Sequence, residues 1–71
     1  MTDMELLLSK IRQSGMTMVA IAEKSGIDRA TLYNRIKGKG EFTASEIVSL
    51  SQVLHLNKPD RDRIFLQSNV N

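Results

Sequence analysis

The stretch that decides the fold is Thr17–Lys39, which reads TMVAIAEKSGIDRATLYNRIKGK. Gly26 separates two short segments with the periodicity of a helix, and glycine adopts the positive φ of a tight turn without steric cost. Ala22 supplies the small side chain needed where two steeply crossing helices touch, and Ile27 anchors the corner in the core. The stretch therefore predicts a helix-turn-helix. We expect its two helices at about 18–25 and 29–37.

Capping residues and helix breakers divide the rest of the chain into three further helices. Asp3 is a suitable N-cap and Gly15 a suitable left-handed C-cap for the first of them. Thr43 and Glu46 have the spacing of a capping box, and Pro59 suits the first turn of a helix. The fold class is therefore expected to be all-α, with five helices. We expect the three further helices at about 4–14, 44–54 and 59–67.

The apolar residues of the last two helices predict how these helices pack. The 44–54 helix has a wide apolar arc, so we expect it to be the most buried helix. In the last helix, Ile64 and Phe65 are expected to pack on the bundle, and the place of Leu66 stays open. His55 is expected to interact with the negative end of the 44–54 helix rather than to ligate a metal. The arc is formed by Ile47, Val48, Leu50, Val53 and Leu54.

Length and composition limit the classes of protein to which the chain can belong. Its 71 residues suit one domain, 1–71, and the absence of cysteine excludes disulfides and thiolate metal sites. No nucleophile–base pair and no phosphate-binding glycine pattern are visible, so we expect no enzyme, cofactor, metal or small-molecule ligand. No apolar run approaches the roughly 18 residues of a membrane span. Asp3 and Glu5 disfavour a signal peptide, and we expect a complete, cytoplasmic protein.

The net charge of +2 is unevenly distributed along the chain. No acidic residue stands between Arg29 and Gly40, whereas carboxylates gather near both ends and just after this segment. A locally basic surface on a nearly neutral protein favours a polyanionic partner, although a merely solvated charged face has the same appearance. The cations of the segment are Arg29, Arg35, Lys37 and Lys39.

The outward face of the 29–37 helix has the chemistry of base recognition. An arginine can pair bidentately with guanine O6 and N7, and an asparagine with adenine N6 and N7. Ala30 and the methyl group of Thr31 are small enough to approach a thymine methyl. This helix is therefore predicted to enter the major groove of double-stranded DNA. The face comprises Arg29, Ala30, Tyr33, Asn34 and Lys37, with Thr31 and Arg35 at its sides.

Residues 18–38 resemble the DNA-binding segment of the lambda-repressor-like family, which includes phage Cro and repressor proteins and the XRE regulators. The segment LHLNKPDRDRIFL, residues 54–66, also resembles short Cro-like regulators of phages and prophages in Gram-positive bacteria. The resemblance implies a five-helix domain that represses transcription in a bacterial host cell. It also implies palindromic operators, bound by dimers with half-sites about one helical turn apart.

The resemblance assigns roles to individual residues. Arg29, Ala30 and Asn34 fall on the base-reading positions of the family. Thr17 and Met18 fall at a helix start where backbone amides and the helix dipole hold a phosphate. Tyr33 has a further interpretation, as a residue that fills an edge of the core. The remaining contacts to the DNA backbone are expected from Thr31, Tyr33, Lys37 and Lys39.

Two positions depart from the pattern of the family. Many members have glutamine where this chain has Met18, so only the backbone amide can contribute there. Members also often have an apolar residue at the position of Arg35. The tilt of the 29–37 helix is therefore left open by the sequence, and Arg35 faces either phosphate or solvent.

Two other classes of function compete with a DNA-binding repressor. A helix-turn-helix scaffold can serve as a protein-interaction module, for instance in an antirepressor or an antitoxin-like protein, but it should then show an apolar or acidic outer face. An architectural factor such as an excisionase should show a wedge or wing, and none is visible. The sequence marks no dimer surface, and both a homodimer and a monomer that dimerises only on its operator stay open.

Overall fold

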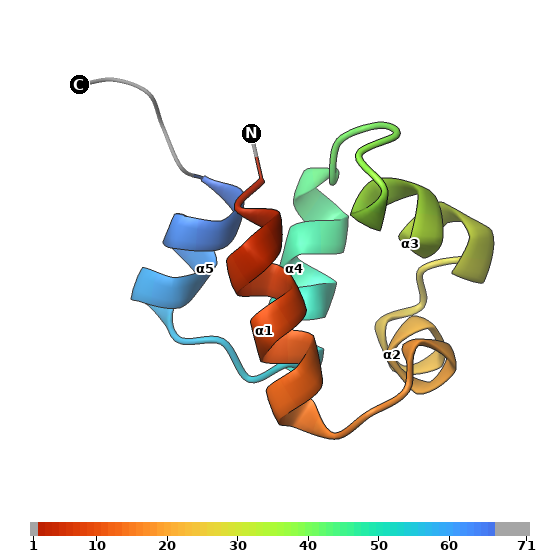
Figure 1. Cartoon of the computed structure of the whole chain (residues 1–71), viewed down its shortest axis with the longest axis horizontal. Coiled ribbons are helices and arrows are strands. Elements are labelled where there is room, and N and C mark those ends of the chain that lie inside the picture. The colour runs from red at the N-terminus through yellow and green to blue at the C-terminus, as the bar shows by residue number, and fades with distance from the viewer. Residues whose placement is uncertain (1, 67–71) are drawn as a thin grey trace.

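The computed structural model describes residues 2–66, and within this range the chain consists of helices joined by short loops, without strands (Figure 1). The expected all-α class is confirmed for these residues. The helices are α1 (Met4–Ser14), α2 (Met18–Ser25), α3 (Arg29–Ile36), α4 (Ala44–Val53) and α5 (Lys58–Phe65).

The expected ends of three helices need small corrections. α3 and α4 end one residue earlier than expected, because Lys37 and Leu54 are C-caps whose amides donate to carbonyls of the last turn. α5 begins one residue earlier, because Asn57 is its N-cap and accepts a bond from the amide of Asp60. It ends at Phe65, since Leu66 leaves the helical conformation. Residue 67, the expected end, lies outside the described residues.

Each of the five helices is preceded by an N-cap residue, whose side chain accepts a hydrogen bond from a backbone amide of the first turn. These bonds satisfy some of the donors that a helix start leaves without partners, so each helix starts at a defined residue. At the other end, α1 and α2 each stop at a glycine in the left-handed region, with φ of 72° at Gly15 and 75° at Gly26. The five N-caps are Asp3, Thr17, Asp28, Thr43 and Asn57.

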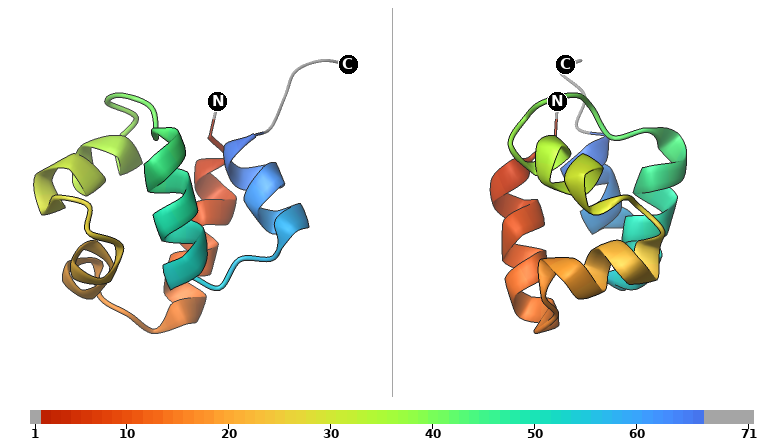
Figure 2. Two further views of the ribbon diagram at one scale, coloured as in Figure 1. Left: turned by 180° about the vertical axis from the view of Figure 1, so that it is seen from behind. Right: turned by 90° about the vertical axis from the view of Figure 1, so that its right-hand side faces the viewer.

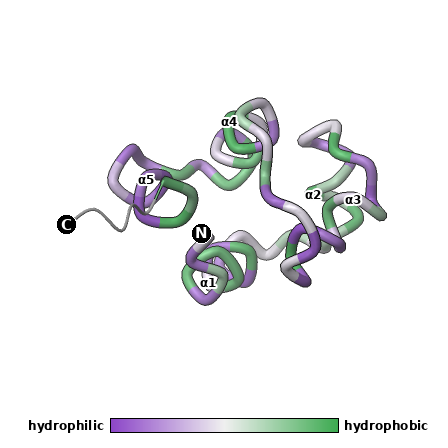
Figure 3. Tube along the Cα trace, turned by 90° about the horizontal axis from the view of Figure 1, so that it is seen from above, coloured by the Kyte–Doolittle hydropathy of each residue, from purple (hydrophilic) through white to green (hydrophobic). Residues whose placement is uncertain are grey.

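The helices form two groups that meet along α4. α1, α4 and α5 pack together, while α2 and α3 form a separate pair on the other side (Figures 1 and 2). α2 packs against both α3 and α4 and thus joins the pair to the bundle. The side of α5 that faces α1 is hydrophobic and its outer side hydrophilic (Figure 3). The core residues are Leu7, Ile11, Ile21, Ala22, Ile27, Leu32, Leu50, Leu54, Ile64 and Phe65.

The apolar arc of α4 is narrower than expected. Leu50 is the one buried residue within α4, whereas α1, α2 and α5 each bury two, so the expectation that α4 is the most buried helix is wrong. Val48 is 54% exposed, because α2 and α5 leave that side of α4 uncovered. Leu66, whose place the sequence left open, is 55% exposed.

Two contacts tie distant parts of the chain to α5. The amide of Asp3 donates a hydrogen bond to the carbonyl of Ile64, at 2.7 Å. The ring of Phe42, in the loop between α3 and α4, meets the ring of Phe65 edge-on, with 5.3 Å between the centroids and 77° between the planes. α5 therefore fixes both the start of α1 and the loop that leads from α3 to α4.

Candidate nucleic-acid interface

The corner between α2 and α3 is fixed by backbone bonds and one serine. The amide of Gly26 donates to the carbonyls of Ala22 (2.9 Å) and Glu23 (3.4 Å). The hydroxyl of Ser25 donates to the carbonyl of Ala22 and accepts from the amide of Ile27, at 3.2 and 3.3 Å. Ile27 is buried, so the residue after the turn is anchored in the core as the sequence suggested. The start of α3 thus has a defined position relative to α2.

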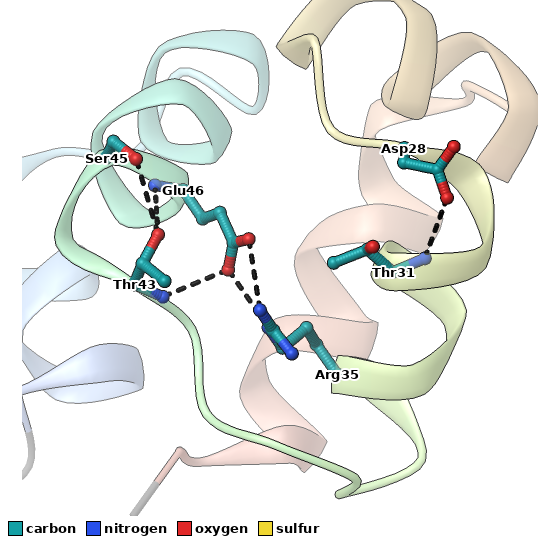
Figure 4. A network of polar contacts seen from close by, with 6 residues as sticks. All are labelled: Asp28, Thr31, Arg35, Thr43, Ser45 and Glu46. Atoms are coloured by element: carbon teal, nitrogen blue, oxygen red, sulfur yellow. Dashed lines mark hydrogen bonds and ion pairs between the residues drawn. The ribbon is translucent and has the colours of Figure 1, made fainter.

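Asp28 uses its carboxylate to cap α3. The oxygen Oδ2 accepts hydrogen bonds from the amides of Ala30 (3.1 Å) and Thr31 (3.3 Å), as Figure 4 shows for Thr31. This carboxylate faces the positive end of the helix, which reduces its effect on an approaching anion. From Arg29 to Gly40 no other carboxylate follows along the chain.

The outer face of α3 is exposed along the helix. Leu32 is completely buried and attaches the helix to the core, whereas Arg29, Ala30 and Asn34 are all exposed. Ala30 and Asn34 are four residues apart and therefore lie on one face. Tyr33 is 41% exposed and therefore also contributes to this surface. The three residues predicted to read bases are thus all exposed, with Arg29 at the start of α3 and the other two on one face.

The start of α2 keeps two backbone amides open. The Thr17 hydroxyl accepts the amide of Ala20 (3.1 Å) and is therefore engaged as a cap. In the described part of the chain, the amides of Met18 and Val19 donate no hydrogen bond, as is usual for the first turn of a helix. The Met18 side chain packs against the core, so the group it offers to a phosphate is its amide.

The loop after α3 holds two lysines beside the outer face. The amide of Lys39 donates to the carbonyl of Asn34 (2.8 Å), and the amide of Gly38 donates to that of Arg35 (3.0 Å). Gly38 has φ of 84°, which allows the loop to fold back on the helix end. Lys37 and Lys39 are both exposed. The loop therefore adds two cations to the end of the surface formed by α3.

Arg35 neither faces solvent freely nor points to the outer face, the two alternatives left open by the sequence. Its Nε donates to Oε1 of Glu46 (3.0 Å), and its Nη2 donates to Oε2 (3.3 Å), as Figure 4 shows. The side chains of Arg35 and Glu46 are 21% and 15% exposed. We call this pair the Arg35–Glu46 brace. It connects α3 with α4 across the loop.

Glu46 has a second partner in the capping box of α4. Its Oε1 accepts the amide of Thr43 (2.9 Å), while the Thr43 hydroxyl accepts the amide of Glu46 (3.2 Å). The hydrogen bond from Arg35, followed by the bond from Thr43, lowers the pKa of the Glu46 carboxyl below its ordinary value against the opposing effect of desolvation. The carboxylate therefore stays ionised between its two donors.

The described residues offer little for other kinds of site. In residues 2–66, no group of three or more His, Cys, Asp or Glu side chains is arranged to hold a metal ion. None of the five helices has the length and hydrophobicity needed to cross a membrane.

Comparison with known proteins agrees with the geometry of this corner. A family model described as helix-turn-helix matches residues 8–60, which include α2, α3 and the Arg35–Glu46 brace. No curated protein and no solved structure matches the chain significantly. The matched range covers most of the chain and confirms both the resemblance and the expected fold. The chain belongs to the lambda-repressor-like, Cro- and XRE-type helix-turn-helix family of DNA-binding regulators.

Proposed function

We propose that the protein is a sequence-specific transcriptional repressor of the Cro type, from a phage or prophage, that reads the major groove of its operator with α3. The observation that supports this proposal is the exposed surface of α3, which presents Arg29 at the start of the helix and Ala30 and Asn34 on one face. Two lysines follow α3 in the next loop, and the carboxylate of Asp28, which precedes the helix, is engaged in capping. Such a surface presents donors to both base edges and phosphates.

In this proposal the residues divide into two groups. Arg29 pairs with a guanine, Asn34 with an adenine, and Ala30 allows the helix to approach a thymine methyl. The second group contacts the DNA backbone and fixes the position of the helix without reading sequence. Its members are Thr17, Met18, Thr31, Tyr33, Lys37 and Lys39, where Thr17 and Met18 act at the start of α2.

A Cro-type regulator binds two half-sites as a dimer, formed either in solution or only on the operator. Residues 1–71 form one domain in this proposal. The fraction of operators that carry bound protein is set by the concentration of the protein and by competition for operators. It acts in the cytoplasm of the bacterial host, where the operator is. Sedimentation of the free and of the operator-bound protein distinguishes the two modes of dimerisation.

A protein-interaction module is less compatible with the surface. Such a module would present an apolar or acidic face on α3, where this chain has a polar and basic one. An acidic partner protein remains the competing binding partner, so the test uses DNA directly and compares duplexes of different sequence.

The test selects duplexes from a library of random 20-base-pair inserts with the parent protein and then measures affinities for the enriched duplex and a scrambled one. Arg29→Ala and Asn34→Ala should each reduce the ratio of the two affinities by roughly 5- to 150-fold, the discrimination of one base contact. A parent that enriches no sequence, or two variants that keep the full ratio, would overturn base reading by α3.

A further inference from the structure

α3 is attached to the rest of the molecule by few apolar contacts. Leu32 is its one buried residue, and Ile36 is only partly buried against the core. The backbone of α3 packs mainly on α2, which in turn packs on α4. The corner at Gly26 and Ile27 fixes where α3 begins, but one fixed point does not determine the direction of a helix axis.

The Arg35–Glu46 brace supplies a second point near the other end of α3. Arg35 is the penultimate residue of the helix, and its guanidinium meets the Glu46 carboxylate with two nearly parallel hydrogen bonds. A paired arrangement of this kind restricts orientation as well as distance, because the guanidinium and the carboxylate are both planar. The end of α3 is therefore held at a defined angle to the start of α4.

The carboxylate in the brace is itself held in place. Glu46 belongs to the first turn of α4 and accepts the amide of Thr43 with the same oxygen, Oε1, that accepts Nε of Arg35. The capping box thus restrains the rotamer of Glu46 independently of Arg35. Figure 4 shows the side chain of Glu46 between Thr43 and Arg35.

We infer that Arg35 and Glu46 are positioning residues, which set the tilt of α3 and thereby decide whether Arg29 and Asn34 reach their bases together. This inference rests on the proposed function, because it assigns the origin of its sequence selectivity. Arg35 contacts no DNA in this arrangement. Its charge is neutralised by Glu46, and a contact with phosphate would leave the largely buried carboxylate without its partner.

The inference predicts that removing either partner has the same effect. Arg35→Met and Glu46→Gln should each lower the ratio of affinities for the enriched and scrambled duplexes about tenfold, within the range of a single lost base contact. The double variant should lower the ratio no further than either single variant, because both changes break one interaction. The dependence of affinity on salt should keep its slope in Arg35→Met. Circular dichroism and thermal unfolding establish that each variant is folded.

Glu46→Gln is the more informative variant, because glutamine keeps an acceptor oxygen for the amide of Thr43 but loses the charge and the second acceptor, Oε2, to which Nη2 of Arg35 donates. It also makes the protein more positive, which raises affinity for every duplex and is the reason that the ratio is measured. Glu41→Gln is the matched control, since Glu41 is exposed and lies in the loop before α4. This control should raise both affinities and leave their ratio unchanged.

A different result overturns the inference. If Arg35 were a phosphate contact, Arg35→Met would reduce the salt slope by about one unit, and Glu46→Gln would release the arginine and tighten binding. If the two variants changed affinity in opposite directions, or if both kept the ratio of affinities, the positioning role of Arg35 and Glu46 would be excluded.

Hydrogen exchange of the free protein tests the brace without DNA. If the parent protein enriches no duplex, the proposed function fails. Hydrogen exchange then still tests whether Arg35 and Glu46 hold the end of α3. Glu46→Gln should accelerate exchange of the Ile36 and Lys37 amides at the end of α3, relative to the amides of α1. Equal exchange in parent and variant would contradict the inference even if the parent binds DNA selectively.

Discussion

Gly40 lies against the guanidinium of Arg35, so closely that a Cβ built on Gly40 would come within 2.6 Å of Nη1. Gly40 also has φ of 88°, a backbone conformation that residues with a side chain rarely adopt. The glycine is therefore required twice, once by the backbone of the loop and once by the Arg35–Glu46 brace. The atom that a Cβ would meet is the end of a flexible side chain, and we expect its displacement to disturb the neighbouring hydrogen bonds from Nε and Nη2 to Glu46.

Gly40→Ala and Gly38→Ala form a matched pair that separates these two requirements. Both glycines have positive φ, so each substitution should destabilise the fold by about 1–2 kcal/mol through the backbone alone. A Cβ at Gly38 meets nothing within 4 Å, whereas one at Gly40 displaces Arg35. We expect Glu46→Gln to cost little further stability in the Gly40→Ala background and its full amount in the Gly38→Ala background.

Urea unfolding of the single and double variants measures this coupling between the substitutions. The side chains of the pair are 21% and 15% exposed, and ion pairs at protein surfaces contribute about 0–1 kcal/mol, so the midpoints should be compared under identical conditions at low salt. Equal coupling of Glu46→Gln to both glycine variants would show that the guanidinium does not depend on Gly40.

The ionisation of Glu46 should make the fold sensitive to acid. Arg35, as the largest cause, lowers the pKa of Glu46 from its ordinary value of 4.5. A depressed native pKa means that the stabilisation is complete above about pH 4.5 and is lost as the pH falls through the native value. We therefore expect the free energy of unfolding to fall in this acidic range, and to fall less steeply in Glu46→Gln.

Asp62 provides the comparison for this pH dependence. The neighbouring Lys58 side chain, more than Arg61, lowers the pKa of the Asp62 carboxyl. Ionised Asp62 therefore adds a pH dependence of the free energy of unfolding with the same sign as that of Glu46. Because Asp62 belongs to α5 and is unrelated to the brace, Asp62→Asn should remove only that part. Chemical unfolding at a series of pH values distinguishes the two, and identical profiles for the parent and Glu46→Gln would contradict the assignment to Glu46.

Lys37→Ala should weaken binding to all duplexes by a similar factor. Lys37 is exposed at the end of α3, where a phosphate contact would release about one counterion. The slope of log affinity against log salt concentration should therefore decrease by about one unit, while the ratio between enriched and scrambled duplexes stays the same. Lys58→Ala, on α5, is the control and should leave the slope unchanged. A loss confined to the enriched duplex would assign Lys37 to base reading instead.

Asp28→Ala should destabilise the protein by about 1 kcal/mol, because it removes the acceptor for the amides of Ala30 and Thr31. Asp28→Asn keeps an acceptor oxygen and should cost less. It also removes a negative charge from the edge of the candidate interface and should raise affinity for every duplex. Thermal unfolding checks the first effect and titration of a scrambled duplex the second. Equal stability of the alanine and asparagine variants would show that the cap contributes little.

The sequence predicted the features that depend on neighbouring residues. Caps such as Asp28 and Thr43 act on amides two or three residues away, and Gly26 acts on its own backbone, so their patterns are visible in the chain. The exposed position of Asn34 follows from the buried position of Leu32 and the period of the helix, whereas Arg29 stands three residues before Leu32 and is exposed as the first residue of α3.

The features that sequence reasoning missed depend on how helices pack. Arg35 and Glu46 are 11 residues apart on different helices, and nothing local indicates that one lies opposite the other. The exposure of Val48 likewise follows from which sides of α4 its neighbours cover. His55 has φ of 54° after the end of α4, where glycine or asparagine is the usual residue, so its conformation gave no signal.

The hydrogen bond from Asp3 to Ile64 closes the described chain into a loop. The amide nitrogen of Asp3, the N-cap of α1, lies 2.7 Å from the carbonyl oxygen of Ile64 in α5, so a covalent link between these two segments would span a short gap. A circular permutant that opens the chain at the exposed His55, in the loop between α4 and α5, would preserve the face of α3. The same closure provides a point at which two copies could be fused in tandem, on the side of the molecule away from α2 and α3 (Figure 1).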